Sequence, residues 1–157
     1  MMLHTTQPQL RIGKVVPTFG LPDLRGNEVK RSVERGRRHL ALLFLEQIDI
    51  SAEAYLREVT QEYAAIREAD GTLMAVLSDP AAAADELRAK FDFPFPLLLD
   101  RESTARSKFL PADASCGLFI LDRYGALHAQ WTLSAPPFPP VSEIVEWLHV
   151  LDRQCSL

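Results

Sequence analysis

The sequence predicts an α/β fold built on a central, mostly parallel sheet that is covered on both faces. The run Leu40–Leu45 is apolar throughout and does not alternate, which is typical of a strand buried on both faces. A second run of the same kind follows at Leu73–Leu77. Between them the large residues recur at helical spacing, at Tyr55, Val59, Tyr63 and Ile66. Strand, helix and strand in this order favour parallel pairing through a right-handed crossover.

The composition is that of an ordinary soluble domain and excludes several classes of protein. The 157 residues carry a net charge of -4, which gives no electrostatic case for nucleic acid. The polar segment Met1–Gln9 is not expected to act as a secretory signal, and no apolar run is long enough to span a membrane. We therefore expect a cytoplasmic protein with a flexible N-terminal arm over residues 1–12 and a single domain over residues 13–157.

Cysteine and histidine are too few and too scattered to suggest a disulfide framework or a metal site. The two cysteines, Cys116 and Cys155, stand far apart, which fits a reducing compartment. The histidines have no metal-ligand spacing with each other or with cysteine; they are His4, His39, His128 and His149. We expect neither a metal nor a cofactor.

The N-terminal part of the predicted domain reads as a short hairpin at the domain edge. Phe19 and Leu21 alternate with small or turn residues, and Gly26-Asn27 is a turn signal before Val29. The polar, basic stretch from Lys30 to His39 is expected to be a solvated connection to the first buried strand.

Two helices and a short strand are expected in the middle of the chain. The first helix begins after Ser51, which can cap it, and closes at Asp70-Gly71. Asp79-Pro80 suits the start of the second helix, whose inner face would carry Ala84, Leu87 and Phe91. Pro94 and Pro96 restrict the run that ends at Asp100 to a short strand near an edge. Asp100 then caps a short helix over residues 101–109.

The C-terminal part reads as two antiparallel strands and a helix. Cys116–Leu121 forms one strand and Arg123-Tyr124-Gly125 turns the chain. Leu127–Leu133 alternates apolar and polar residues, as a half-exposed strand does. An apolar stripe from Val141 to Leu151 predicts the last helix. A βαβ unit followed by a ββα unit is the core arrangement of the thioredoxin fold, here with an N-terminal hairpin and a small insertion before the ββα unit.

The loop between the first buried strand and its helix is where α/β folds usually place their chemistry. In this chain it holds Glu46, Asp49, Ser51 and Ala52. A carboxylate pair can do acid–base work where its environment separates the two pKa values. The sequence favours the simpler interpretation, in which Asp49 or Ser51 caps the helix and Glu46 is solvated.

The chain resembles the peroxiredoxins of the alkyl hydroperoxide reductase/thiol-specific antioxidant (AhpC/TSA) family, within the thioredoxin-like superfamily. The resemblance runs from about Gly13 to Leu151. It rests on the order and spacing of four pieces: the Gly13…Pro17-Thr-Phe19-Gly-Leu21…Gly26…Val29 stretch, the strand Leu40–Leu45, Phe95–Asp100, and Leu118-Phe-Ile-Leu-Asp122-Arg-Tyr-Gly125. It implies an antioxidant or oxidoreductase lineage.

The family's chemistry does not carry over to these residues. In the family a peroxide-attacking cysteine lies in the loop or first helical turn that corresponds to Glu46–Tyr55, and this span contains no cysteine. The family also places an arginine just before the strand that ends at Asp122, where this chain has Cys116. Because a reactive thiolate needs both a sulfur and a positive neighbour, we expect no ordinary peroxidase activity.

Cys116 is the candidate catalytic residue, and two interpretations of it stay open. It is either a relocated reactive thiol beside the vacated loop, or a small buried apolar residue at a strand start, which the sequence favours. Cys155 is expected to be a bystander thiol rather than a resolving one.

Two functions follow from these features. The favoured one is a non-catalytic thioredoxin-fold protein that binds a protein partner or a small ligand in the old active-site cleft. The alternative is a thiol oxidoreductase that uses Cys116. Trp131, Phe138 and the segment Pro136–Pro140 could line a groove, although a core tryptophan and a stiff connector are the simpler interpretations. A homodimer is expected, because C2 dimers are the commonest assembly.

Overall fold

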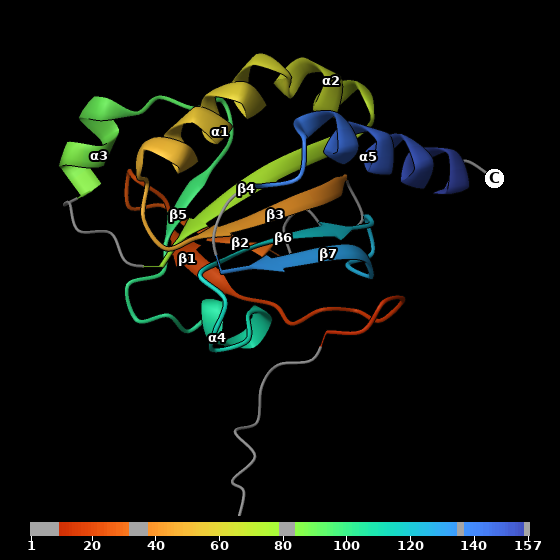
Figure 1. The fold of residues 1–157 in the computed structure, drawn as a ribbon, viewed down its shortest axis with the longest axis horizontal. Helices are drawn as coiled ribbons and strands as arrows, with labels where there is room; N and C mark the ends of the chain where they lie inside the picture. Colours follow the sequence, from red (N-terminus) through yellow and green to blue (C-terminus); the bar gives the residue numbers. More distant parts are fainter. Residues whose placement is uncertain (1–9, 32–37, 79–83, 135–136, 156–157) are drawn as a thin grey trace, which may run out of the picture.

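A five-stranded mixed sheet forms the centre of the molecule in the computed structural model, which describes residues 10–31, 38–78, 84–134 and 137–155 (Figure 1). The strand order is β5-β4-β3-β6-β7. The strands are β3 (His39–Leu45), β4 (Gly71–Leu77), β5 (Leu97–Leu99), β6 (Cys116–Leu121) and β7 (Leu127–Leu133). β3 runs parallel to β4 and antiparallel to β6. The predicted central position of this strand is therefore confirmed, as is the antiparallel pair formed by β6 and β7.

The N-terminal hairpin is present as a separate two-stranded sheet of β1 (Gly20–Pro22) and β2 (Glu28–Lys30). Its turn is held by Asp23, whose Oδ1 accepts hydrogen bonds from the backbone N–H groups of Arg25 and Asn27. Gly26 has a φ of +85°, a conformation that glycine adopts at little cost. A backbone bridge between Asp23 and Leu98 places the hairpin against β5.

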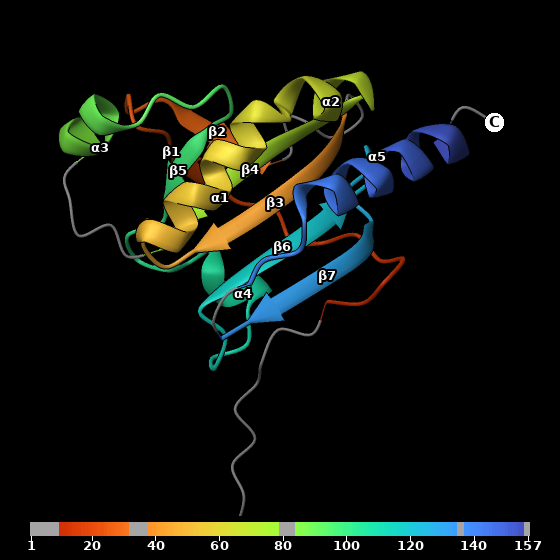
Figure 2. The same ribbon diagram turned by 45° about the horizontal axis from the view of Figure 1, so that its top comes forward.

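Helices cover the two faces of the sheet unequally. Figures 1 and 2 show α1 (Ile50–Gln61), α2 (Tyr63–Glu68) and α5 (Val141–Cys155) over one face. The short helix α4 (Arg106–Phe109) lies on the other face together with the N-terminal segment. The remaining helix, α3 (Ala84–Lys90), adds Leu87 to the core on the side of α1. Every residue of β3 and β4 is buried, which explains why neither run alternates.

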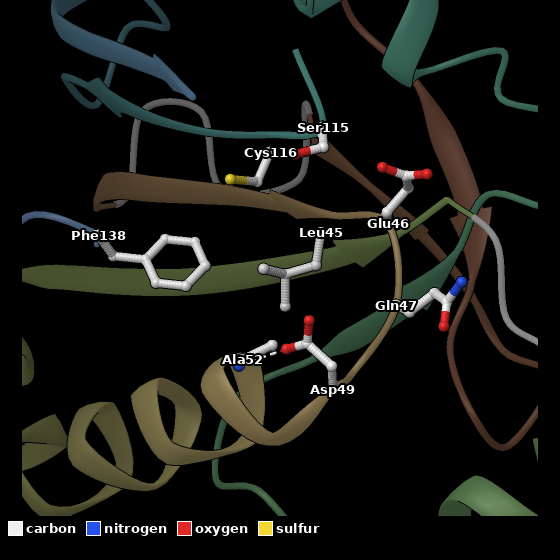
Figure 3. Close-up of a pocket in the computed structure, with 8 residues that line it drawn as sticks. All are labelled: Leu45, Glu46, Gln47, Asp49, Ala52, Ser115, Cys116 and Phe138. Carbon is white, nitrogen blue, oxygen red and sulfur yellow. Dashed lines mark hydrogen bonds between the residues drawn. The ribbon is translucent and has the colours of Figure 1, made fainter. Parts of the chain in front are cut away.

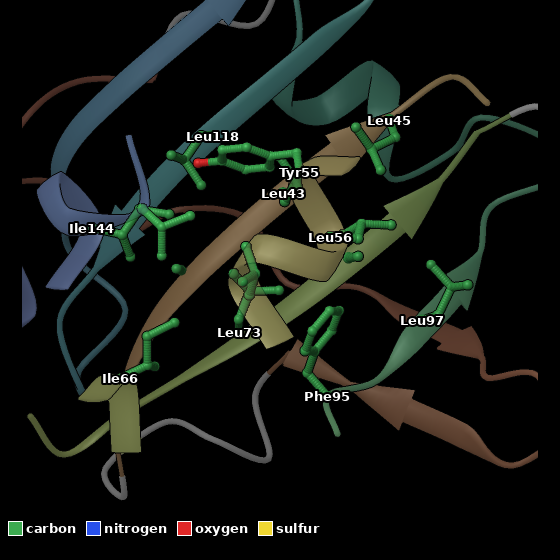
Figure 4. Close-up of a cluster of buried hydrophobic side chains, with 14 of the residues drawn as sticks. Leu43, Leu45, Tyr55, Leu56, Ile66, Leu73, Phe95, Leu97, Leu118 and Ile144 are labelled. Atoms are coloured by element: carbon green, nitrogen blue, oxygen red, sulfur yellow. The ribbon is translucent and has the colours of Figure 1, made fainter. Parts of the chain in front are cut away.

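Two apolar cores lie on opposite faces of the sheet. The helical core, drawn in Figure 4, joins alternate residues of β3 such as Leu43 to residues of α1, α2 and α5 such as Leu56 and Ile144. The aromatic core lies on the other face and contains Phe44 among four mutually packed rings, the others being Phe19, Phe109 and Phe119. Full burial of such side chains contributes roughly 1.5–3 kcal/mol each, so the two cores provide the main stabilisation of the fold.

The helix expected from Ser51 to Ala69 is divided, which is a correction to the sequence analysis. α1 ends at Gln61 and α2 begins at Tyr63. The Thr60 hydroxyl donates to the carbonyl oxygen of Leu56 at 2.8 Å, and bonds of this kind bend helices. The Tyr63 hydroxyl bonds Thr72 Oγ1 on β4 at 2.9 Å and so fixes α2 on the sheet. The residue with left-handed backbone after α2 is Asp70, with a φ of 58°.

The insertion before β6 is also less helical than expected. The helix predicted over residues 101–109 is confined to α4, and Ser103 has a φ of 57°. Asp100 is 1% exposed, and its carboxylate accepts hydrogen bonds from the backbone N–H groups of Ala105 at 3.3 Å and Arg106 at 2.8 Å. Asp100 therefore caps the start of α4 rather than a helix that begins at residue 101.

The predicted edge position of β5 is confirmed, as are the half-exposed character of β7 and the apolar stripe of α5. The helix start predicted at Asp79-Pro80 and the side chain of Ala84 lie outside the described residues, as do residues 1–9 of the predicted arm and Pro136. Within the described ranges, every helix is too short or too polar to cross a membrane.

Candidate functional site at the carboxyl end of β3

A pocket of about 230 Å³ opens where β3 ends, α1 begins and β6 starts (Figure 3). It is lined by Leu45, Glu46, Gln47, Asp49, Ala52, Ser115, Cys116 and Phe138. The fold therefore brings Cys116 to the loop that follows β3, although the two are about 70 residues apart in sequence. Of the residues singled out from the sequence, Glu46, Asp49, Ala52 and Cys116 line this pocket, and Ser51 is exposed outside its lining.

Asp49, rather than Ser51, caps α1. Its Oδ1 accepts the backbone N–H of Ala52 at 2.9 Å, and α1 begins at the next residue, Ile50. The predicted capping role in this loop therefore belongs to the earlier of the two candidates. Asp49 still borders the pocket, because only one of its two oxygens faces the helix (Figure 3).

Cys116 is buried at the first position of β6 and is 5% exposed. Its Sγ donates to the carbonyl oxygen of Leu133 at 3.6 Å. Burial raises the pKa of the Cys116 thiol, the charges of Glu46 and Asp49 raise it further, and the Ser115 hydrogen bond and the Arg106 charge oppose them. The net direction is upward, so the thiol is neutral at neutral pH, the opposite of an activated nucleophile.

Arg106 lies behind the pocket and was not identified from the sequence. Its guanidinium donates to the carbonyl oxygens of Ala114 and Ser115 and to Ser78 Oγ. These bonds hold the start of β6 against the end of β4. Arg106 and Cys116 are ten positions apart across an irregular segment, so no periodic pattern could have indicated this contact.

The wall of the pocket opposite the loop is formed by Phe138. Its ring stacks on Tyr55 of α1 with centroids 4.6 Å apart. Trp131, the other aromatic residue considered for a groove, is partly buried and packs against the helical core. Cys155 is the last residue of α5, and its side chain lies outside the described residues.

A second group of polar side chains lies at the other end of β3. Ligand-type atoms of His39, Asp70 and Asp152 lie within 4.8 Å of one another. Arg123 Nη2 stands 3.2 Å from His39 Nε2, 2.8 Å from Asp70 Oδ2 and 3.3 Å from Asp152 Oδ1. The guanidinium therefore occupies the position that a metal ion would need, and it supplies the positive charge itself.

Comparison with known proteins identifies the family. The family model described as "AhpC/TSA family" matches residues 12–130. Peroxiredoxin Q, chloroplastic, from Oryza sativa subsp. japonica is 25% identical over 145 residues. That match covers 88% of this chain and 65% of the relative, so the chain spans less than two thirds of the length of the curated relatives it matches.

The solved structures establish the fold. Peroxidoxin BcpB from Mycobacterium tuberculosis has a TM-score of 0.74 at 16% identity, covering 93% of this chain and 98% of its own. The reduced 2-Cys peroxiredoxin of Plasmodium vivax has a TM-score of 0.78 at 15% identity, and the match covers 92% of this chain and 83% of that structure's chain. The match to the family model over most of the chain, on a thioredoxin-like fold with peroxiredoxin neighbours, shows that the chain belongs to the AhpC/TSA family.

Proposed function

We propose that this chain is a non-catalytic member of the peroxiredoxin family that binds a protein partner or a small ligand in the pocket at the end of β3. The observation that carries the proposal is the state of Cys116. The pocket's one sulfur is buried, neutral and hydrogen-bonded to Leu133. The segment Glu46–Tyr55 has no cysteine to take its place.

The electrostatics of the pocket support the same proposal. A thiolate is stabilised by a nearby positive charge. The pocket is instead bordered by two carboxylates, Glu46 and Asp49. The guanidinium of Arg106, which bonds the Ser115 carbonyl, is engaged by Ser78 and two carbonyl oxygens. This arrangement disfavours ionisation of the sulfur while leaving a concave, partly polar surface on which a ligand can rest.

A turnover assay tests the proposal. The purified protein is incubated with hydrogen peroxide or an alkyl hydroperoxide, with a dithiol or a thioredoxin system as donor. We expect consumption of peroxide at the rate of the protein-free control. Repeated turnover that survives Cys155→Ser would overturn the proposal.

One observation favours a second candidate, a thiol oxidoreductase that uses Cys116. The Arg106 charge lowers the pKa of the thiol even though burial outweighs it. If turnover were found and were lost in Cys116→Ser, this second function would replace the first. Mapping which cysteine reacts with hydrogen peroxide in the native protein provides the same distinction without turnover.

We also propose a homodimer formed through β7, with the face that bears the vacated loop as the rival surface. β7 is an edge strand, and its sequence contains neither lysine nor proline to prevent pairing. The N-terminal segment covers one end of this edge, where Gly13 donates to Leu127 O and Leu127 donates to Lys14 O. Light scattering after size exclusion tests the proposal, and a monomer mass at high micromolar concentration would end it.

A further inference from the structure

Tyr55 connects α1 to the segment that precedes α5. Its hydroxyl donates to the carbonyl oxygen of Pro139 at 2.7 Å, in a buried bond between residues 84 positions apart. Its ring stacks on Phe138 at an interplanar angle of 26°. Tyr55 itself is 7% exposed. Two contacts from one side chain, a hydrogen bond and a ring stack, therefore hold consecutive residues of the same segment.

Phe138 is the residue that links this connection to the pocket. It lines the pocket together with Cys116, and Figure 3 shows its ring at the end toward which the Cys116 sulfur points, away from Gln47. A stacked pair of this kind contributes roughly 0.5–1.5 kcal/mol beyond its buried area, so Tyr55 fixes where the ring stands. The position of this wall in turn limits how closely a ligand can approach Cys116.

We infer that Tyr55 and Phe138 form a clasp that sets the width of the pocket and controls the size of the molecule that can reach Cys116. In this clasp Phe138 is the specificity-determining wall and Tyr55 is a positioning residue that acts through it. The relevance of this width to a natural ligand rests on the proposed binding function. The width itself is a property of the pocket and can be measured without that ligand.

The chemistry of Tyr55 suits a permanent clasp. Burial raises the pKa of its hydroxyl, with smaller contributions from Glu58 and Glu143. The hydroxyl is therefore a neutral donor at neutral pH. The acceptor is the backbone carbonyl oxygen of Pro139, which does not titrate.

Two maleimides of different size measure the width. In a Cys155→Ser background, Cys116 is alkylated with N-methylmaleimide and with N-phenylmaleimide, which are uncharged and share one reactive group. Tyr55→Phe keeps the ring but removes the hydrogen bond. We expect this variant to raise the rate at which N-phenylmaleimide alkylates Cys116 by about fivefold, because the loss of one hydrogen bond changes the population of the open pocket by about that factor. Phe138→Leu shortens the wall, and we expect a gain of about tenfold or more for the phenyl reagent. The methyl reagent should change by less than about twofold in both variants.

Tyr63→Phe is the matched control. It removes the hydroxyl of another tyrosine, which lies on α2 and outside the lining of the pocket. This hydroxyl bonds Thr72 Oγ1 on β4 at 2.9 Å. We expect it to leave the ratio of the two labelling rates unchanged. A general loosening of the fold would raise both rates together, so the ratio separates a clasp from a merely structural role.

The inference is overturned if neither clasp variant raises the ratio of the phenyl to the methyl rate, or if Tyr63→Phe raises it equally. Should Tyr55→Phe fail to fold, as judged by circular dichroism, Phe138→Leu alone decides, because Phe138 is partly exposed and outside the helices. The outcome is independent of peroxide turnover, so the clasp and the proposed function can fail separately.

Discussion

Protonation of His39 should destabilise the protein, because the folded structure favours the neutral ring over the protonated one. His39 is completely buried, and its Nδ1 accepts the backbone N–H of Arg123 at 3.2 Å. A proton on Nδ1 would remove this acceptor. Burial lowers the pKa of His39 and the Arg123 charge lowers it further, against the opposing carboxylates of Asp152, Asp70 and Asp122.

The sign and the upper limit of the effect follow from this direction. The unfolded chain takes up the proton at a pKa of about 6.5, above that of the folded state, so full stability is present above this pH and is lost as the pH falls. If the folded ring remained neutral, the loss would reach about 1.4 kcal/mol at pH 5.5. The loss levels off below the folded pKa, where both states carry the proton.

Urea unfolding, followed by tryptophan fluorescence at several pH values between 7.5 and 5.5, measures this loss. His39→Asn offers Arg123 an uncharged acceptor, so it should lower stability at pH 7.5 but remove most of the decline toward pH 5.5. His149→Asn, on α5, is the control in which the decline should persist. A wild-type free energy of unfolding that is constant over this range, or a decline that is equally large in His39→Asn, would refute the reasoning.

Two further predictions concern residues near the starts of α1 and β6. Asp49→Ala should lower the free energy of unfolding by about 1 kcal/mol, because the backbone N–H of Ala52 loses its capping acceptor. In the same urea titration, Ser51→Ala should lower the free energy of unfolding by clearly less. Gly117→Ala should cost about 1–3 kcal/mol, because the added Cβ would meet the Leu110 side chain and the Phe119 ring; full stability in this variant would contradict the packing described.

The sheet could be predicted from the sequence because its signals are local. The uninterrupted apolar run of β3 reflects burial on both faces, and the alternation of β7 reflects one face that is more exposed than the other. The prolines around β5 likewise restricted it to a short edge strand, as observed. In each case the burial of a strand can be deduced from the residues of that strand alone.

The details of the site could not be predicted because they depend on contacts between distant segments. The Tyr55–Pro139 bond joins positions 84 residues apart, and the Arg106 contacts depend on how an irregular segment folds back. The choice between Asp49 and Ser51 as cap depended on the helix start, which lies at Ile50, two residues before the start expected after Ser51. The resemblance to the AhpC/TSA family placed Cys116 beside the loop but carried no information about its hydrogen bond to Leu133.

The division of β3 between two cores has a consequence for thermodynamic coupling. Leu43 belongs to the helical core and its neighbour Leu42 to the aromatic core, with the hydrogen-bonded backbone of the sheet between them. In double-mutant cycles, truncation of Leu42 and truncation of Phe119, which share a core, should show a larger coupling in the free energy of unfolding than truncation of Leu42 and Leu43. Adjacent residues would then act almost independently, while residues far apart in the chain act together. Sequence change on the helical side, where the pocket lies, could accordingly accumulate with little effect on the packing of the opposite face.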